Sequence, residues 1–142
     1  MVSPERGCIS STWIGPEGEV AVVGVEDLER PNSDQFLEFF RSFSHVSFVQ
    51  NIVSDARLSA GDEVAVMVQG MGGTSNMEKF IFCKDVRGQL SDLNLKVTNS
   101  FIGEYTSSME MAGLQLTILK LDEELKGLLE EPTEAPGWHV WS

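Results

Sequence analysis

The chain has 142 residues, a length that favours a single domain with a core large enough to need no disulfide or metal. Its 22 acidic residues outnumber its 10 basic residues, which gives a net charge of -12 at pH 7. Nucleic acids and anionic membrane surfaces are bound through clustered Lys and Arg, so we expect neither as a partner.

The composition also bears on compartment, metals and cofactors. The cysteines Cys8 and Cys83 have no C-x-x-C spacing, which favours a reducing compartment. We find no run of about 18–20 apolar residues and no secretory signal at the start, so we expect a cytoplasmic location and no membrane span. Cys83 is interpreted as a small buried hydrophobe in preference to a catalytic thiol. The acidic residues are interpreted as solvated surface, and we expect no metal and no cofactor in this chain.

The N-terminal part of the chain carries one strand pattern and one helix pattern. Residues 1–10 predict a loosely held terminus, and the glycines and proline within residues 11–18 predict a turn. Residues 20–25 form a short β-branched run that predicts a strand. Residues 44–60 fit either a strand or a helix turn. A stripe after Pro31 predicts a helix packed on the core, in preference to an aromatic ligand site, through Phe36, Leu37, Phe39, Phe40 and Phe43.

The stretch from residue 61 to residue 121 organises the chain. The apolar run at residues 63–69 predicts a strand covered on both faces, as in a parallel sheet. Ser75 and Glu78 form a capping box at the start of a helix. Residues 95–102 predict the next strand, and a strand–helix–strand unit of this length predicts a right-handed parallel crossover. The buried face of the helix is expected to carry Phe82, Val86, Leu90 and Leu93.

Three further elements follow. Ser107 and Glu110 predict a second capping box, in a short helix that ends at Gly113. Residues 114–118 alternate between apolar and polar side chains and predict a third strand. Leucines recur at helical spacing over residues 121–129 and predict a last amphipathic helix.

The tail after Pro132 is expected to be turn-like, with Trp138 and Trp141 able to pack on the body. Together, these patterns predict an α/β fold with a mixed, mainly parallel sheet and helices packed on its faces. We expect one small domain over residues 1–142.

The glycine-rich turn at residues 70–73 has two interpretations. A turn between a strand and a helix start can bind an anion, because free backbone N–H groups and the helix dipole favour negative charge. The segment lacks the Lys of a phosphate-binding P-loop, and Ser75 stands where a G-x-G-x-x-G motif has its third glycine. Glycines that let the chain turn and the helix pack closely are the favoured interpretation.

Ordered segments of this stretch carry a family resemblance. They are Gly61–Val66, Gly70–Thr74, Met77–Glu78, Gly103–Gly113 and Leu119–Leu125, with an echo in the tail at Glu130–Trp138. These segments resemble the substrate-binding (DhaK-type) subunit of the dihydroxyacetone kinases. That family carries sequences close to GDEVAVLVNG, LGATPLMELYI, VGNYMTSLDMAG and SLTLLKLDDEL. The match covers residues 61–138, is nearly gapless, and leaves residues 1–60 divergent.

The resemblance implies that the chain corresponds to the C-terminal half of that subunit. In the family this half helps to close a site over a small ketose, and an N-terminal half supplies a glycine loop and most of the polar contacts. A His in a motif like GIHGEPG holds the ketone as a hemiaminal, which fixes a very small ligand in one orientation. The phosphate comes from ATP on a separate domain or from a phosphorylated partner subunit.

This sequence departs from the family at the His. The nearest counterpart is the segment from Thr12 to Gly18, and alignment on its glycines places Ile14 at the His position. The histidines of the chain are His45 and His139, and we expect neither to replace it. Glu104 stands where the family has Asn, and Thr106 where it has Met. We assign no catalytic residue, and the candidate binding residues are Gly15, Gly18, Gly70, Gly72, Gly73, Thr74, Glu104 and Ser107.

Three functions are compatible with these patterns. The chain could be part of a dihydroxyacetone (glycerone) kinase substrate subunit of glycerol metabolism, inactive without an N-terminal half or a nucleotide-binding kinase subunit. It could instead be a free-standing, non-catalytic relative that forms a homodimer or binds a regulatory partner. An enzyme with a different small ligand is the third. The Ile at position 14 favours the second function over the third.

Overall fold

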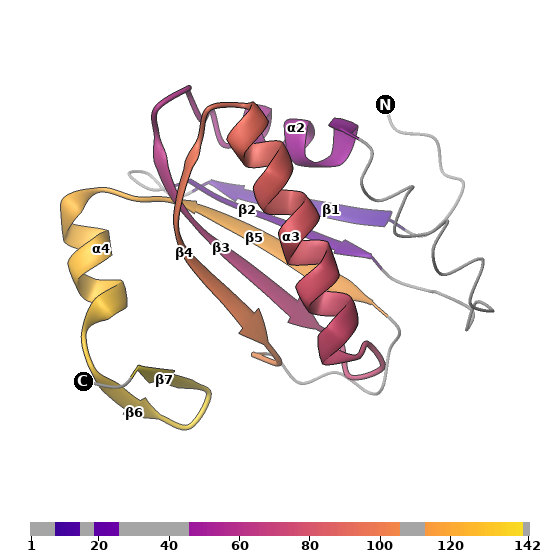
Figure 1. Cartoon of the computed structure of the whole chain (residues 1–142), viewed down its shortest axis with the longest axis vertical. Helices are drawn as coiled ribbons and strands as arrows, with labels where there is room; N and C mark the ends of the chain where they lie inside the picture. Colours follow the sequence, from indigo (N-terminus) through magenta and orange to yellow (C-terminus); the bar gives the residue numbers. More distant parts are fainter. Residues whose placement is uncertain (1–7, 15–18, 26–45, 106–112, 141–142) are drawn as a thin grey trace.

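The computed structural model describes residues 8–14, 19–25, 46–105 and 113–140. Five strands form one sheet in the order β1-β2-β5-β3-β4 (Figure 1). β3 and β4 are parallel, whereas β5 runs antiparallel to both β3 and β2, and β1 runs antiparallel to β2. The strands are β1 Cys8–Ile14, β2 Glu19–Val25, β3 Glu63–Gly70, β4 Lys96–Gly103 and β5 Leu114–Lys120.

The α/β class, the mixed sheet and the parallel crossover from β3 to β4 are confirmed, but the expectation of a mainly parallel sheet is wrong. Three of the four strand pairings are antiparallel. A buried apolar run has the same pattern whichever way its neighbour runs. Only the helix between β3 and β4 imposes a direction, because a parallel partner needs a long crossover.

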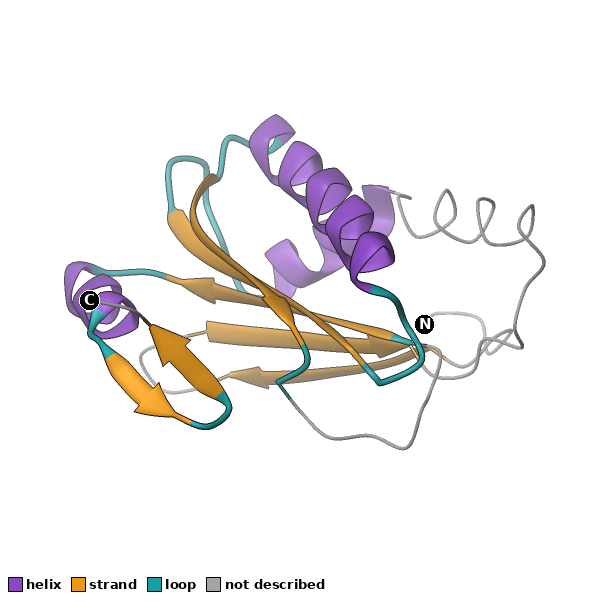
Figure 2. Cartoon of the chain, turned by 60° about the horizontal axis from the view of Figure 1, so that its bottom comes forward, coloured by secondary structure: helices purple, strands orange, loops and turns teal. Residues whose placement is uncertain are grey.

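The helices of the described residues are α2 Val46–Asp55, α3 Asn76–Asp92 and α4 Glu123–Glu130. α2 and α3 lie on the same face of the sheet (Figure 2). α2 resolves the ambiguity of residues 44–60 in favour of a helix. The capping box of α3 is confirmed, since the Ser75 side chain accepts from the backbone of Glu78 and the Glu78 side chain accepts from the backbone of Ser75. No described helix is both long and apolar enough to cross a membrane.

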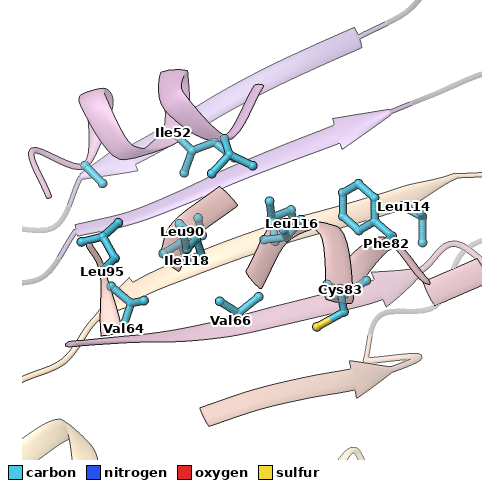
Figure 3. Close-up of a cluster of buried hydrophobic side chains, with 14 residues drawn as sticks. Ile52, Val64, Val66, Phe82, Cys83, Leu90, Leu95, Leu114, Leu116 and Ile118 are labelled. Atoms are coloured by element: carbon cyan, nitrogen blue, oxygen red, sulfur yellow. The ribbon is translucent and has the colours of Figure 1, made fainter. Parts of the chain in front are cut away.

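The core fills the space between the sheet and the helices α2 and α3 (Figure 3). Alternate residues of β3 and β5 face this layer, in keeping with the period of two in a strand. The apolar face of α3 packs on these residues, which confirms the predicted buried face of this helix. Full burial of one such side chain stabilises the fold by roughly 1.5–3 kcal/mol. The buried residues include Val64, Val66, Val68, Phe82, Val86, Leu90, Leu114, Leu116 and Ile118.

The C-terminal tail forms a two-stranded hairpin, β6 Thr133–Ala135 and β7 Trp138–Val140, where a turn-like segment was expected. The packing of Trp138 on the body is confirmed. Its ring centroid lies 4.4 Å from that of Phe101 and 5.4 Å from that of Tyr105. Phe101 pairs with Met67 in the sheet and therefore faces away from the α3 side. The hairpin thus packs on the sheet face opposite the helices.

Two other expectations need correction. Cys8–Ile14 forms β1, although residues 1–10 were expected to be loose and residues 11–18 to turn. Hydrogen bonding to β2 satisfies this backbone, and its weakly apolar sequence gave no sign of the pairing. The leucine face of α4 is not buried, and Leu128 is 58% exposed. The phenylalanine helix after Pro31, the Ser107 capping box and Trp141 lie outside the described residues.

Ion pairs connect four elements at the N-terminal end of β3. Asp62 Oδ2 lies 2.7 Å from Lys120 Nζ, and Glu63 Oε2 lies 2.6 Å from Lys126 Nζ. Glu63 also pairs with Lys96, so one carboxylate joins β3 to β4 and α4. The bonds from Lys126 and Lys96 lower the pKa of Glu63 to about 2, and the bond from Lys120 lowers the pKa of Asp62.

Stability should therefore depend on pH through Glu63. Its carboxylate is ionised in the folded chain at a pH where it is protonated in the unfolded chain. The contribution is fully present above pH 4.5 and is lost as pH falls from 4.5 toward 2. Urea unfolding across this range should show a steeper loss of stability for the wild type than for Glu63→Gln. Glu134→Gln is the matched control and should keep the wild-type slope; equal slopes for all three proteins would contradict the role of Glu63.

Candidate functional site

The candidate site lies at the edge of the sheet where β3 and β4 end. Because these strands are parallel, their C-terminal ends meet at one edge, and Gln69 pairs with Gly103 there. β5 runs the other way and begins at the same edge, where Leu114 pairs with Gly70. The turn into α3 starts from this edge as well (Figure 1). The predicted glycines therefore gather where three strand ends and a helix start meet.

Thr74 fastens the glycine turn to the start of β5. Its hydroxyl donates to the carbonyl oxygen of Gly113 at 2.7 Å and accepts from the Gly113 N–H at 3.1 Å. The Met71 N–H donates to the same carbonyl at 3.2 Å. Gly72 has a φ of 94°, a conformation that side chains other than glycine rarely adopt. The turn is thus held in one shape by three hydrogen bonds and one glycine conformation.

The start of α3 carries its own negative group. Glu78 Oε2 accepts from the Ser75 N–H at 2.5 Å, and the Glu78 N–H donates to Ser75 Oγ at 3.4 Å. A carboxylate in the first turn satisfies free N–H groups and interacts well with the helix dipole. An anion at this turn would therefore meet a fixed negative charge beside it. This arrangement favours the packing role of the glycines.

A half-buried ion pair joins Lys79 and Glu104 near the turn. Lys79 is 1% exposed, and its Nζ lies 2.5 Å from Oε1 of Glu104, whose side chain is 43% exposed. A Cβ added at Gly70 would meet the Glu104 carboxylate, so the glycine lets this carboxylate lie against the end of β3. The pair joins the first turn of α3 to the end of β4, and places a lysine among the buried residues of the helix.

Sequence reasoning missed Lys79. The signal that could have found it is its position, three residues before Phe82 and seven before Val86, which places it on the buried face of α3. The family segment LGATPLMELYI has Leu at the matching position, and the segment VGNYMTSLDMAG has Asn where this chain has Glu104. The two departures compensate each other, because a buried cation needs a paired anion.

The predicted site residues divide into two groups. The structure brings Gly70, Gly72, Gly73, Thr74 and Glu104 together at the glycine edge. Gly15, Gly18 and Ser107, together with His45 and Thr106, lie outside the described residues.

Ile14 lies at the opposite end of the sheet. It is the last residue of β1 and pairs with Glu19. The neighbouring Val20 pairs with Leu119, and Leu119 with Ala65, which is near the start of β3. Ile14, which the family resemblance aligns with the His, therefore lies at the end of the sheet where β3 begins, with β2 and β5 between it and β3, and not at the glycine turn. Ile14 and the glycine turn thus lie at opposite ends of the sheet.

Two further candidate residues, His139 and Cys83, lie in β7 and in the core. His139 lies in β7, in register with Glu134. Cys83 is buried among core residues, and burial raises the pKa of its thiol, which disfavours the reactive thiolate. Within residues 8–14, 19–25, 46–105 and 113–140, no three His, Cys, Asp or Glu side chains form a group that could hold a metal ion.

These features define an α/β protein whose parallel strand pair ends in a glycine turn fastened to an antiparallel neighbour. The chain matches the Dak1 domain over residues 31–137. It therefore belongs to the Dak1 domain family, which confirms the resemblance to dihydroxyacetone kinase substrate subunits.

Curated relatives agree with this family. The dihydroxyacetone-binding subunit DhaK of a PTS-dependent dihydroxyacetone kinase from Listeria innocua is 43% identical over 90 residues, which cover 63% of this chain and 27% of the relative. An L-erythrulose kinase from Pectobacterium atrosepticum is 30% identical over 134 residues, or 89% of this chain and 22% of the relative. The chain thus spans about a quarter of the length of these relatives.

Solved structures share the fold. A protein solved in a study of the regulation of the dha operon of Lactococcus lactis aligns with a TM-score of 0.66 and 20% identity, over 85% of this chain and 42% of that protein. A dihydroxyacetone kinase operon co-activator aligns with a TM-score of 0.65 and 24% identity, over 72% and 32% of the two chains. At these identities the likeness concerns the fold alone.

The exchange of the Leu and Asn of the family for Lys79 and Glu104 can be tested by unfolding. Glu104→Gln leaves a buried ammonium without its anion and should lower the free energy of unfolding by on the order of 1–3 kcal/mol. The double variant Lys79→Leu/Glu104→Asn restores the family residues and should lie within about 1 kcal/mol of the wild type, or above it. Urea denaturation measures all three proteins.

Glu124→Gln, at an exposed position, is the control and should change stability by no more than about 0.5 kcal/mol. A double variant as unstable as Glu104→Gln would contradict the compensating pair.

Proposed function

We propose that the chain is a C-terminal part of a dihydroxyacetone kinase substrate-binding subunit, and that it neither captures nor phosphorylates the ketone alone. The proposal rests on a Dak1 match over residues 31–137, together with the isoleucine at position 14, which the family resemblance aligns with the ketone-binding His. An isoleucine side chain has no lone pair to add to a carbonyl group.

The contacts at the two ends of the sheet support the proposal that the chain alone does not capture the ketone. The glycine edge is occupied by groups of the chain itself, since Thr74 bonds Gly113 and Lys79 bonds Glu104. At the other end, Ile14 is the last residue of β1, and β2 and β5 separate this strand from β3. A nucleophile, an electrophilic contact and a closed pocket must meet within hydrogen-bond reach for ketone capture. The described residues bring no such set together.

The proposal also covers the partners of the chain and its location in the cell. Phosphate transfer would need a nucleotide-binding kinase subunit or domain, and the chain itself would bind no cofactor. The remainder of a Dak1-type subunit would supply the polar ketose contacts. We also propose a cytoplasmic location and a role in glycerol metabolism, which fits relatives that are named as kinase subunits.

A second candidate function is a non-catalytic dimerisation or regulatory module that acts without the remainder of such a subunit. The observation that favours it is the exposure of large apolar side chains on a described helix, with Met77 at 72% and Phe80 at 59%. Exposed apolar groups that lie together are typical of surfaces that bind another protein.

Ketone capture can be measured by native mass spectrometry of the intact chain incubated with dihydroxyacetone. We expect an unchanged mass, because no imidazole occupies the capture position. The Listeria innocua DhaK subunit, measured under the same conditions, is the positive control and should carry the adduct.

An adduct on this chain that persists in His45→Ala but disappears in His139→Ala, or the reverse, would contradict the proposal and identify a replacement nucleophile. An adduct that survives both substitutions would contradict it as well, and would assign capture to a residue other than histidine.

A further inference from the structure

The outer face of α3 carries an apolar stripe that the core does not use. Met77, Phe80 and Ile81 are 72%, 59% and 43% exposed. Their spacing of i, i+3 and i+4 places them on one face of the helix, opposite the buried residues Phe82 and Val86. Apolar side chains exposed singly are ordinary, whereas three that adjoin on one helix indicate a docking surface.

Positive charge continues this stripe along the helix. Lys84 follows Phe80 and Ile81 by four and three residues, and Arg87 follows Lys84 by three. Lys79, Lys96, Lys120 and Lys126 each pair with a carboxylate. Within the part of the chain that the structure describes, Lys84 has no such pair, and Arg87 donates to the Ser100 hydroxyl at 2.8 Å. In a chain of net charge -12, this face therefore suits an acidic, apolar partner.

α4 has the complementary surface. Leu128 is 58% exposed, and Leu125, three residues before it on the same helix face, is partly exposed. Glu124 lies four residues before Leu128 and Glu131 three residues after it, so a leucine flanked by two carboxylates faces outward. α4 cannot reach α3 within one molecule, because the two helices lie on different sides of β4 in both views (Figures 1 and 2).

We propose that the outer face of α3 binds α4 of a second copy of the chain, in a head-to-tail contact. Leu128 would pack on Phe80 and Ile81, and the glutamates beside it would face Lys84 and Arg87. A symmetric contact between two α3 helices is less favourable, because it would bring two sets of unpaired cations into one interface. A head-to-tail contact leaves an α3 face free at one end of the pair and an α4 free at the other, so association continues into rings or chains. The inference is independent of ketone binding.

The direct test mixes two variants, each with one face removed. Ile81→Asp disables the α3 face, and Leu128→Asp disables α4. Sedimentation velocity should show concentration-dependent association for the wild type and monomers for each variant alone. The equimolar mixture should form a one-to-one dimer that grows no further, because only one intact pair of faces remains. Gln50→Asp, an exposed change on α2, is the control and should associate as the wild type does.

A charge exchange tests the same contact with milder changes. Lys84→Glu should weaken association at least several-fold at low salt, and Glu124→Lys in the same chain should restore it. Thermal unfolding followed by circular dichroism, which should not change, shows that each variant is folded. A monomeric wild type at millimolar concentration, a mixture that stays monomeric, or a Leu128→Asp protein that associates like the wild type would overturn the proposal.

Discussion

The hydrogen bonds between Thr74 and Gly113 are the contact on which the arrangement of the sheet edge depends. Thr74 follows β3 and Gly113 precedes β5, so a single side chain fixes the exit of one strand against the entry of its antiparallel neighbour. The carbonyl of Gly113 also receives the Met71 N–H. A threonine that both donates to and accepts from one residue satisfies backbone groups that the end of a sheet would otherwise leave unpaired. The glycine turn therefore has a structural role, which is to hold the end of β3 against the start of β5.

The two ends of the sheet are stabilised by different contacts. The edge with Gly70 and Gly103 is closed by the contacts of Thr74 and by the Lys79–Glu104 pair, whereas the other end is held by Asp62 and Glu63 with three lysines. A pair with one buried partner is costly to break but adds little over an apolar replacement. The exchange of the Leu and Asn of the family for Lys79 and Glu104 thus changes the charge of the edge more than its stability. The edge of this chain therefore carries the carboxylate of Glu104 where the family segment has the amide of Asn.

Local signals predicted most elements, and long-range contacts account for most of the differences. Ser75 and Glu78 identified the start of α3 because a capping box is read within four residues, and the β3–α3–β4 order identified the parallel pair. The direction of β5 could not be predicted, since the alternation from Leu114 to Ile118 is the same in either orientation. The glycines, Thr74 and Glu104 were predicted as one group, but the partner of Thr74 lies 39 residues away. Lys79 was missed because a lysine in a helix is ordinarily solvated.

Amide hydrogen exchange on two Thr74 variants tests the account most directly. Thr74→Ser keeps the hydroxyl, whereas Thr74→Val keeps the shape and removes it. If this side chain fastens the edge, the amides of Met71 and Gly113 should exchange faster in Thr74→Val than in the wild type or Thr74→Ser, while the amides of Val66 and Ile118 in the core keep their protection. Equal protection of Met71 and Gly113 in all three proteins would contradict the account.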